Sequence, residues 1–228
     1  MRISLAALTL VLLVPAASSQ SQYGGGQGAY FGFSGPGLSW TGGDFSGFGM
    51  RGEGGRRLGN GVDVGLLGAF SHYGLHSDQV GVTSWTLGTT AGIARPAPLG
   101  TVARLAGLVA YRDHAGDYAN GERLDRSYLI GDVTASLGKE IPLVGSVRVQ
   151  PTAGLFAQFA GALDVDASDT FAPNRESKLY SGIQLELPVL FRVLGKDAVL
   201  SAGYRILPGQ ASGATATTAP GLTFRVNF

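Results

Sequence analysis

The last eight residues of the chain alternate strictly between two kinds of side chain. One face of this segment is apolar and consists of Leu222, Phe224, Val226 and Phe228. The other face is polar and consists of Thr223, Arg225 and Asn227. A period of two residues is that of a β-strand whose two faces meet different environments. Because chain ends usually fray, an amphipathic strand in this position indicates that the last strand pairs with another strand of a sheet.

Such strands suit a closed antiparallel barrel that spans a membrane, where the last strand pairs with the first and no backbone edge meets hydrocarbon. The composition agrees with an all-β fold of this kind. The mean hydropathy of +0.17 is slightly positive, as expected when half of each strand faces lipid. Glycine, at 37 of 228 residues, suits the tight curvature of a narrow barrel. The formal net charge of +1 gives no basic field for nucleic acid.

The N-terminal residues resemble a secretory signal peptide. Arg2 supplies a positive start, residues 5–14 are apolar apart from Thr9, and residues 15–19 supply the small side chains of a cleavage site. This apolar core is too short to cross a bilayer as a helix. We therefore expect a signal peptide over 1–19, a flexible periplasmic segment over 20–27 and one outer-membrane barrel domain over 28–228.

Short connections that contain Pro or Gly recur along the chain and alternate with longer polar stretches. The short ones are typical of hairpin turns, and the longer ones are typical of extracellular loops. The pattern predicts ten strands, and an eight-stranded barrel is the alternative if residues 29–55 form fewer strands. The ten predicted strands span 28–40, 45–57, 62–72, 82–97, 101–112, 126–140, 145–162, 178–192, 198–207 and 217–228.

The same period places charged side chains on the inner face of the barrel. We favour a structural polar core in which arginines pair with carboxylates. The alternative is a slightly cationic constriction that passes small anions or polar solutes. The predicted lumen-facing residues are Arg51, Glu53, Asp63, Arg104, Asp132, Arg148, Glu186, Arg192, Arg205 and Arg225.

Several aromatic residues lie at or near the ends of the predicted strands, where a belt at the membrane interface is expected. They are Tyr30, Trp40, Trp85, Tyr111, Tyr128, Tyr180 and Tyr204.

The face pattern, the signal peptide and the terminal Phe228 resemble the small outer-membrane β-barrel superfamily of the OmpA transmembrane domain, OmpX and the opacity-like adhesins. The resemblance implies a location in the outer membrane, contacts with its lipids and lipopolysaccharide, and recognition of the C-terminal strand by the barrel-insertion machinery. It implies no oligomeric state. Since that superfamily includes anchors, adhesins, narrow channels and a few enzymes, the fold alone does not choose among these functions. We expect a structural or surface-interaction role first and a narrow channel second.

A hydrolase at the outer rim is the third hypothesis. Its candidate residues are those that supply bases, carboxylates and a hydroxyl near the predicted loops: Ser71, His72, His76, Asp78, Asp113, His114 and Asp117. Catalysis would need a base held by a carboxylate beside a nucleophile or water, and no longer motif fixes that geometry. The sequence therefore assigns no catalytic residue.

Three further patterns fail on their context, so no cofactor or metal is assigned. His72 and His76 have helical metal-ligand spacing but flank Gly74 in a predicted strand region. A stretch that begins at Asp164 resembles a calcium loop, but the required Gly and Glu are replaced by Asp169 and Arg175. Residues 47–52 match a dinucleotide fingerprint, but no helix can follow because more glycines do.

Overall fold

The structure is a computed structural model that describes residues 28–41, 45–59, 61–75, 80–117, 123–165, 178–206 and 218–228. The predicted signal peptide over 1–19 and the segment over 20–27 lie outside the described residues. Among the residues that the structure does describe, no helix is long and apolar enough to cross a bilayer.

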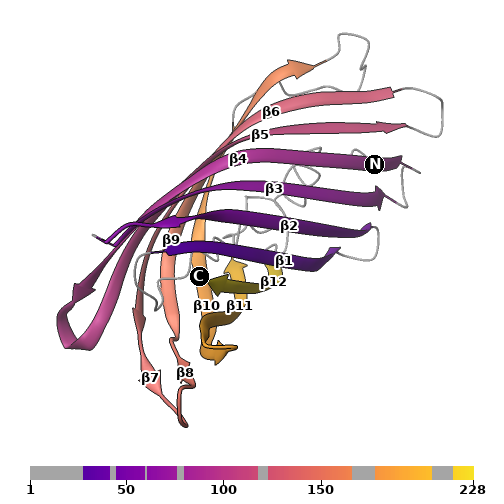
Figure 1. Ribbon diagram of the computed structural model, residues 1–228. Helices are drawn as coiled ribbons and strands as arrows, with labels where there is room; N and C mark the ends of the chain where they lie inside the picture. Colours follow the sequence, from indigo (N-terminus) through magenta and orange to yellow (C-terminus); the bar gives the residue numbers. More distant parts are fainter. Residues whose placement is uncertain are drawn as a thin grey trace.

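The described residues form one antiparallel sheet (Figure 1). It has ten long strands, a short hairpin of two-residue strands and a single 3-10 turn, Pro98–Gly100. The short strands are β7 (Ile141–Pro142) and β8 (Arg148–Val149). The long strands are β1 (Gly28–Thr41), β2 (Phe45–Arg57), β3 (Val62–Leu75), β4 (Val80–Ala97), β5 (Thr101–Asp117), β6 (Arg123–Lys139), β9 (Thr152–Val165), β10 (Lys178–Val193), β11 (Lys196–Ile206) and β12 (Thr218–Asn227).

The sheet closes on itself through the first and last strands. Strand β1 pairs antiparallel with β12, with Phe31 opposite Val226 and Phe33 opposite Phe224. Beyond the last pair, the amide of Phe228 donates to the carbonyl oxygen of Ala29 at 2.8 Å. The remaining long strands pair with their neighbours in chain order. The prediction of a closed ten-stranded antiparallel barrel is therefore confirmed.

The two ends of the barrel differ in how they connect the strands. At the turn end, the hairpins are tight, and two non-glycine residues adopt left-handed backbone conformations: Leu99 with φ 62° and Leu194 with φ 50°. Each is followed by a glycine with positive φ, so both hairpins have the backbone of a primed turn, which matches the twist of paired strands. The hairpin β7–β8 extends from the same end (Figure 1). The longer connections lie at the other end, which we call the loop end.

Several strands reach farther toward the loop end than their sequence pattern predicts. The stretch 113–125 was expected to be a loop, but β5 continues to Asp117 and β6 begins at Arg123. Strand β3 likewise continues to Leu75. The physical reason is that the part of a strand that extends past the membrane toward the loop end needs no apolar outer face. Polar residues in this part therefore do not end the strand pairing.

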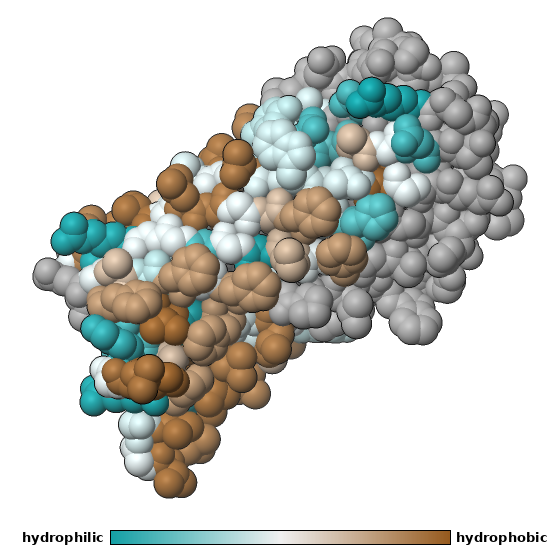
Figure 2. Space-filling model, turned by 45° about the vertical axis from the view of Figure 1, so that its right-hand side comes forward, coloured by the Kyte–Doolittle hydropathy of each residue, from teal (hydrophilic) through white to brown (hydrophobic). Residues whose placement is uncertain are grey.

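The barrel is apolar outside and polar inside. Outward-facing leucines are strongly exposed, for example Leu66 and Leu155, each at 67%. The predicted outer face of the last strand follows this pattern, with Leu222, Phe224 and Phe228 exposed. Figure 2 shows apolar side chains over much of the described exterior. This is the reverse of a water-soluble protein and suits hydrocarbon on the outside.

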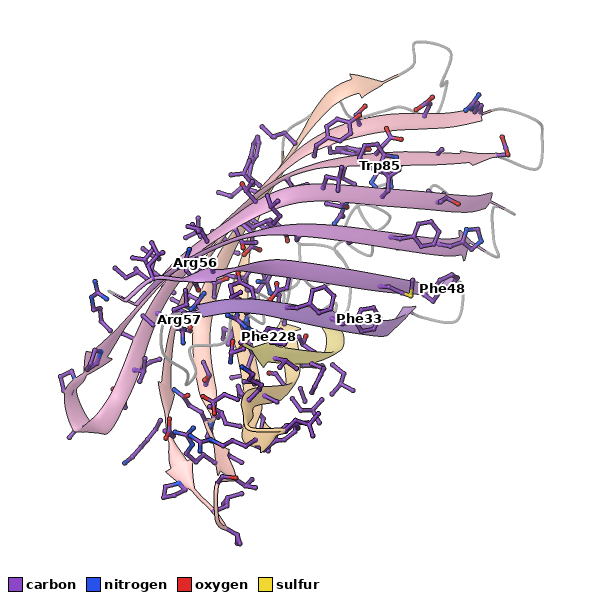
Figure 3. The ribbon with its side chains drawn as sticks, viewed as in Figure 1. Phe33, Phe48, Arg56, Arg57, Trp85 and Phe228 are labelled. Carbon is purple, nitrogen blue, oxygen red and sulfur yellow. The ribbon has the colours of Figure 1, made fainter. Side chains whose placement is uncertain are left out.

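Aromatic side chains gather on the outer face toward the loop end. Trp85 and Tyr111 have ring centroids 5.2 Å apart, and those of Phe48 and Phe70 are 6.1 Å apart. Figure 3 places Phe33, Phe48 and Trp85 away from the turn end of β2, where Arg56 and Arg57 lie. Such a belt is typical of a membrane interface.

Not every tyrosine near a strand end belongs to this belt. Tyr30 is only 4% exposed and lies inside the barrel. Tyr128 also faces inward and packs against the ring of His114, with centroids 5.1 Å apart. Two other aromatic residues expected in the belt, Trp40 and Tyr180, have side chains outside the described part.

Glycines on the inner face make room for neighbouring backbone. A Cβ at Gly88 would lie 2.7 Å from the carbonyl oxygen of Val109 and 2.9 Å from the Cα of Ala110. A Cβ at the outward-facing Gly52 would meet nothing within 4 Å. The barrel wall therefore requires glycine at position 88 but not at position 52.

We expect Gly88→Ala to destabilise the barrel by about 1–3 kcal/mol, the usual cost of overpacking, and Gly52→Ala to leave its stability unchanged. Urea unfolding of the refolded protein, followed by heat-dependent gel mobility, measures both. Equal midpoints for the two variants would contradict the difference in packing.

Candidate functional site

The interior of the barrel contains a set of buried charged side chains. Seven of the ten residues predicted to face the lumen are at most 5% exposed: Arg51, Glu53, Asp63, Arg104, Asp132, Arg205 and Arg225. Glu186 is half-buried on β10, whose alternation also directs it inward. We call these eight residues and their hydrogen-bond partners the interior network.

The first ion pair of the interior network joins β5 to β3 across β4. One guanidinium nitrogen of Arg104 donates to both carboxylate oxygens of Asp63, each at 2.7 Å. The residue of β4 opposite Asp63 is Gly92. A Cβ there would collide with both side chains, so the glycine opens the passage through which the pair forms.

The second ion pair also connects strands that are not neighbours, and these are farther apart in the sheet. Arg205 on β11 donates through Nη1 to Oδ2 of Asp132 on β6 at 2.7 Å. Its other groups also have partners, since Nε donates to Oε1 of Gln184 at 2.9 Å and Nη2 donates to Oγ1 of Thr134 at 3.3 Å. The guanidinium carbon lies 4.5 Å from the ring centroid of Phe156. Strands β9 and β10 lie between β6 and β11 in the sheet, so this cluster bridges the interior over them.

The other charged residues of the interior network make contacts nearer to their own strand. Arg51 donates to Glu53 on the same strand at 3.1 Å. The guanidinium of Arg225 lies 3.4 Å from the ring centroid of Tyr30, and its Nε donates to Oδ1 of Asn227 at 3.1 Å. The aromatic face stabilises the cation, and the carboxylate of Glu53 attracts it as well. Glu186 accepts a hydrogen bond from Gln184, which ties it to the Arg205 cluster.

Arg148 and Arg192 differ from the prediction because they lie at the turn end instead of in the lumen. Arg148 pairs with Glu140 at 2.8 Å, and Arg192 pairs with Asp197 at 3.2 Å. The side chain of Arg192 is 67% exposed. Both arginines lie next to the turns of their hairpins. There, a side chain on the inner alternation extends past the end of the barrel and meets solvent.

Two inward-facing arginines were missed. Arg57 follows the same two-residue period as Arg51 and is half-buried at the turn end of β2. Arg112 is 7% exposed, and its Nε donates to Oγ1 of Thr86 at 2.9 Å. The two-residue period that predicts Arg51 and Arg104 to face inward extends to these two positions, so the sequence carries the signal for both.

The rim residues of the hydrolase hypothesis are not brought together. His72 faces outward on β3, where Nδ1 lies 3.1 Å from Oγ1 of Thr83. His114 faces inward on β5 and is 3% exposed. Ser71 faces inward, whereas Asp113 and Asp117 are on the outward alternation of β5. His76 and Asp78 lie outside the described residues. The two described histidines thus lie on opposite faces of the wall.

The other patterns weighed in the sequence give no site either. Within the described ranges, no three metal-ligating side chains are close enough to hold an ion. The stretch that resembles a calcium loop lies mostly outside those ranges. The residues that resemble a dinucleotide fingerprint lie inside strand β2, and no helix follows them.

Comparison with known proteins identifies the fold. No protein-family model and no curated protein matches the chain. The β domain of the Bordetella autotransporter BrkA superimposes with a TM-score of 0.56 and 13% identity, over 90% of this chain and 100% of that one. The translocator domain of the autotransporter NalP from Neisseria meningitidis gives a TM-score of 0.58 and 13% identity, over 97% and 94% of the two chains.

Both similar structures are outer-membrane barrels, so the chain has the fold of this class. They come from autotransporters and not from the superfamily of OmpA, OmpX and the opacity-like adhesins. The finer resemblance to that superfamily stays a prediction.

We expect Asp132→Ala to destabilise the barrel by about 3–5 kcal/mol, because it leaves the buried guanidinium of Arg205 without its carboxylate. The matched change Asp197→Ala breaks an exposed pair, which is worth less than about 1 kcal/mol. Chemical unfolding of both variants in the same vesicles measures the difference. Losses of similar size would argue against a buried, energetically coupled cluster.

Proposed function

We propose that the chain is an integral outer-membrane barrel that serves as a membrane-embedded scaffold, with an interior sealed by paired charges and with loops that meet the surroundings. The observation that carries the proposal is the interior network. Two of its ion pairs join strands that are not neighbours in the sheet, and its arginine–carboxylate hydrogen bonds are 2.7–3.3 Å long.

The pairing of arginines with carboxylates inside the barrel favours a sealed interior, because the charges that line a conducting pore stay hydrated and available to solutes. Here the carboxylates of Asp63 and Asp132 are 1% and 3% exposed. The guanidinium of Arg205 is held by Asp132, Gln184 and Thr134 together. Separating such a cluster would leave buried charges uncompensated.

A narrow channel is the second candidate, and one observation favours it. Among the described inward-facing residues, arginines outnumber carboxylates: Arg51, Arg57, Arg104, Arg112, Arg205 and Arg225 against Glu53, Asp63, Asp132 and Glu186. An excess of cations would favour anions in any path that water can follow. Arg225 lies over the ring of Tyr30 and donates to Asn227.

Translocation is the role named for the meningococcal domain. It would require a polypeptide to pass where Arg205 reaches Asp132. A helix with its side chains is about 10–12 Å across, so the ion pair would have to open. Similarity at 13% identity carries the fold and not this role.

Single-channel recording in a planar bilayer tests the proposal. We expect the folded wild-type protein to give no discrete conductance steps. The double variant Asp132→Ala/Arg205→Ala removes both charges of the bridging pair at once and leaves neither orphaned, so we expect steps to appear in it.

The double variant Arg192→Ala/Asp197→Ala is the matched control, since it removes an exposed pair at the turn end, and it should remain silent. Heat-dependent gel mobility shows that each protein is folded. Discrete steps in the wild type, with anion selectivity that falls in Arg225→Gln, would overturn the scaffold proposal in favour of the channel.

A further inference from the structure

The outer wall of the barrel has a groove with a volume of about 790 Å³ that crosses strands β2 to β6. Most of its lining residues face outward and belong to two adjacent rows of the sheet. In one row, Gly54, Thr89 and Val109 are in register through β3. In the next, Arg56, Ala91 and Gly107 are in register in the same way. The inward-facing row between these two also lines it and consists of Gly55, Gly65, Thr90, Leu108 and Asp132. These rows run at right angles to the strands, and the strands of a barrel are tilted from its axis. The groove therefore runs obliquely to the barrel axis.

Two glycines that line the groove, Gly54 and Gly107, are small although the barrel wall does not need them to be small. A Cβ at Gly54 would lie 3.7 Å from the nearest atom, the carbonyl oxygen of Tyr30. A Cβ at Gly107 would lie 3.7 Å from the carbonyl oxygen of Asp132. Both are ordinary contacts, in contrast to the inner Gly88. These two glycines therefore keep an outer surface hollow where the fold would accept a larger side chain.

The length and slope of the groove match one leaflet of a bilayer. Four steps between neighbouring strands, of about 4.8 Å each, give about 19 Å. With strands tilted by about 40° from the barrel axis, a row of this length rises about 12 Å along the axis. Half of a hydrocarbon core is about 15 Å thick. The groove starts at Arg56, next to the turn end of β2, and reaches Val133 in the middle of β6.

A cation, Arg56, lies at the end of the groove that is nearest the turn end of the barrel. Arg56 is exposed, and no hydrogen bond or ion pair joins it to another described residue. Figure 3 shows it at the turn end of β2. Basic side chains also outnumber acidic ones among the described residues of this end: Arg56, Arg57, Arg95, Lys139, Arg148, Arg192 and Lys196 against Asp63, Glu140 and Asp197.

We propose that this groove binds one acyl chain of a phospholipid with an anionic headgroup, whose phosphate pairs with Arg56. The apolar floor matches the chain, the free guanidinium matches the phosphate, and the slope matches the leaflet at the turn end. The proposal rests on the outer-membrane location proposed above. It does not depend on whether the interior conducts.

Two other occupants would fit an apolar groove. A lipid with its headgroup at the loop end would not meet Arg56. A second copy of this barrel would bury the groove against protein and would be insensitive to lipid charge. Both become outcomes of the test.

The test is native mass spectrometry of the full-length, refolded protein in detergent, titrated with dioleoylphosphatidylglycerol or dioleoylphosphatidylcholine. We expect one saturable phosphatidylglycerol molecule per barrel. Arg56→Gln should weaken its binding about fivefold, the equivalent of roughly 1 kcal/mol for one cation near an anionic headgroup. Gly107→Leu should fill the groove and weaken the binding of both lipids at least tenfold.

Matched controls separate the groove from the rest of the surface. Gly52→Leu adds the same side chain to an outward position with no atom within 4 Å, and Arg123→Gln removes an exposed cation at the loop end. Neither should change binding. Heat-dependent mobility shows that every variant is folded, and bilayer recording reports on the interior separately.

Three results would overturn the proposal. They are phosphatidylglycerol binding that Gly107→Leu leaves unchanged, binding that Arg123→Gln weakens more than Arg56→Gln, and a Gly107→Cys variant that forms disulfide-linked dimers in place of binding lipid.

Discussion

The closure of the sheet between β1 and β12 is the constraint on which the rest of the structure depends. In hydrocarbon an unpaired backbone group has no water to bind, so an open edge is too costly. The pairing of Phe31 with Val226 and of Phe33 with Phe224, together with the hydrogen bond from Phe228 to Ala29, removes that edge. Once the sheet is closed, each strand has one face toward lipid and one toward a confined interior. Apolar residues on the outside and charged residues on the inside follow from this division.

The interior network and the outer groove are two consequences of using glycine in a narrow wall. Inside, Gly92 lets Arg104 reach Asp63 over β4. The pair could not form over a larger side chain, and unpaired charges there would be costly. Outside, Gly54 and Gly107 have room for side chains that they lack. The same residue type is thus required on one face and optional on the other, and the optional positions are where a binding surface can arise.

Much of the fold follows from the two-residue period, because alternation reports strand and face together. It predicts ten strands and orients Arg205, Asp132 and Arg225 inward. It does not report depth along the axis, so Arg148 and Arg192 were assigned to the lumen although they lie at the turn end. It also misplaced Tyr30, because an aromatic residue near a strand end suits a membrane interface and an arginine partner equally well. The hydrogen-bond partners of the inward-facing charges depend on how far strands that are distant in the sheet are shifted along the barrel axis. The sequence of one strand does not determine that shift. The groove was missed because it lies across five strands at once.

Hydrogen exchange at the seam tests the account most directly. The amides of β1 and β12, including that of Phe228, should exchange as slowly in lipid vesicles as those of β4 and β5, which lie within the continuous sheet. Residue-resolved exchange by mass spectrometry or solid-state NMR measures this. If the seam amides exchange freely while β4 and β5 are protected, the sheet is open, and neither a sealed interior nor a lipid-facing exterior follows.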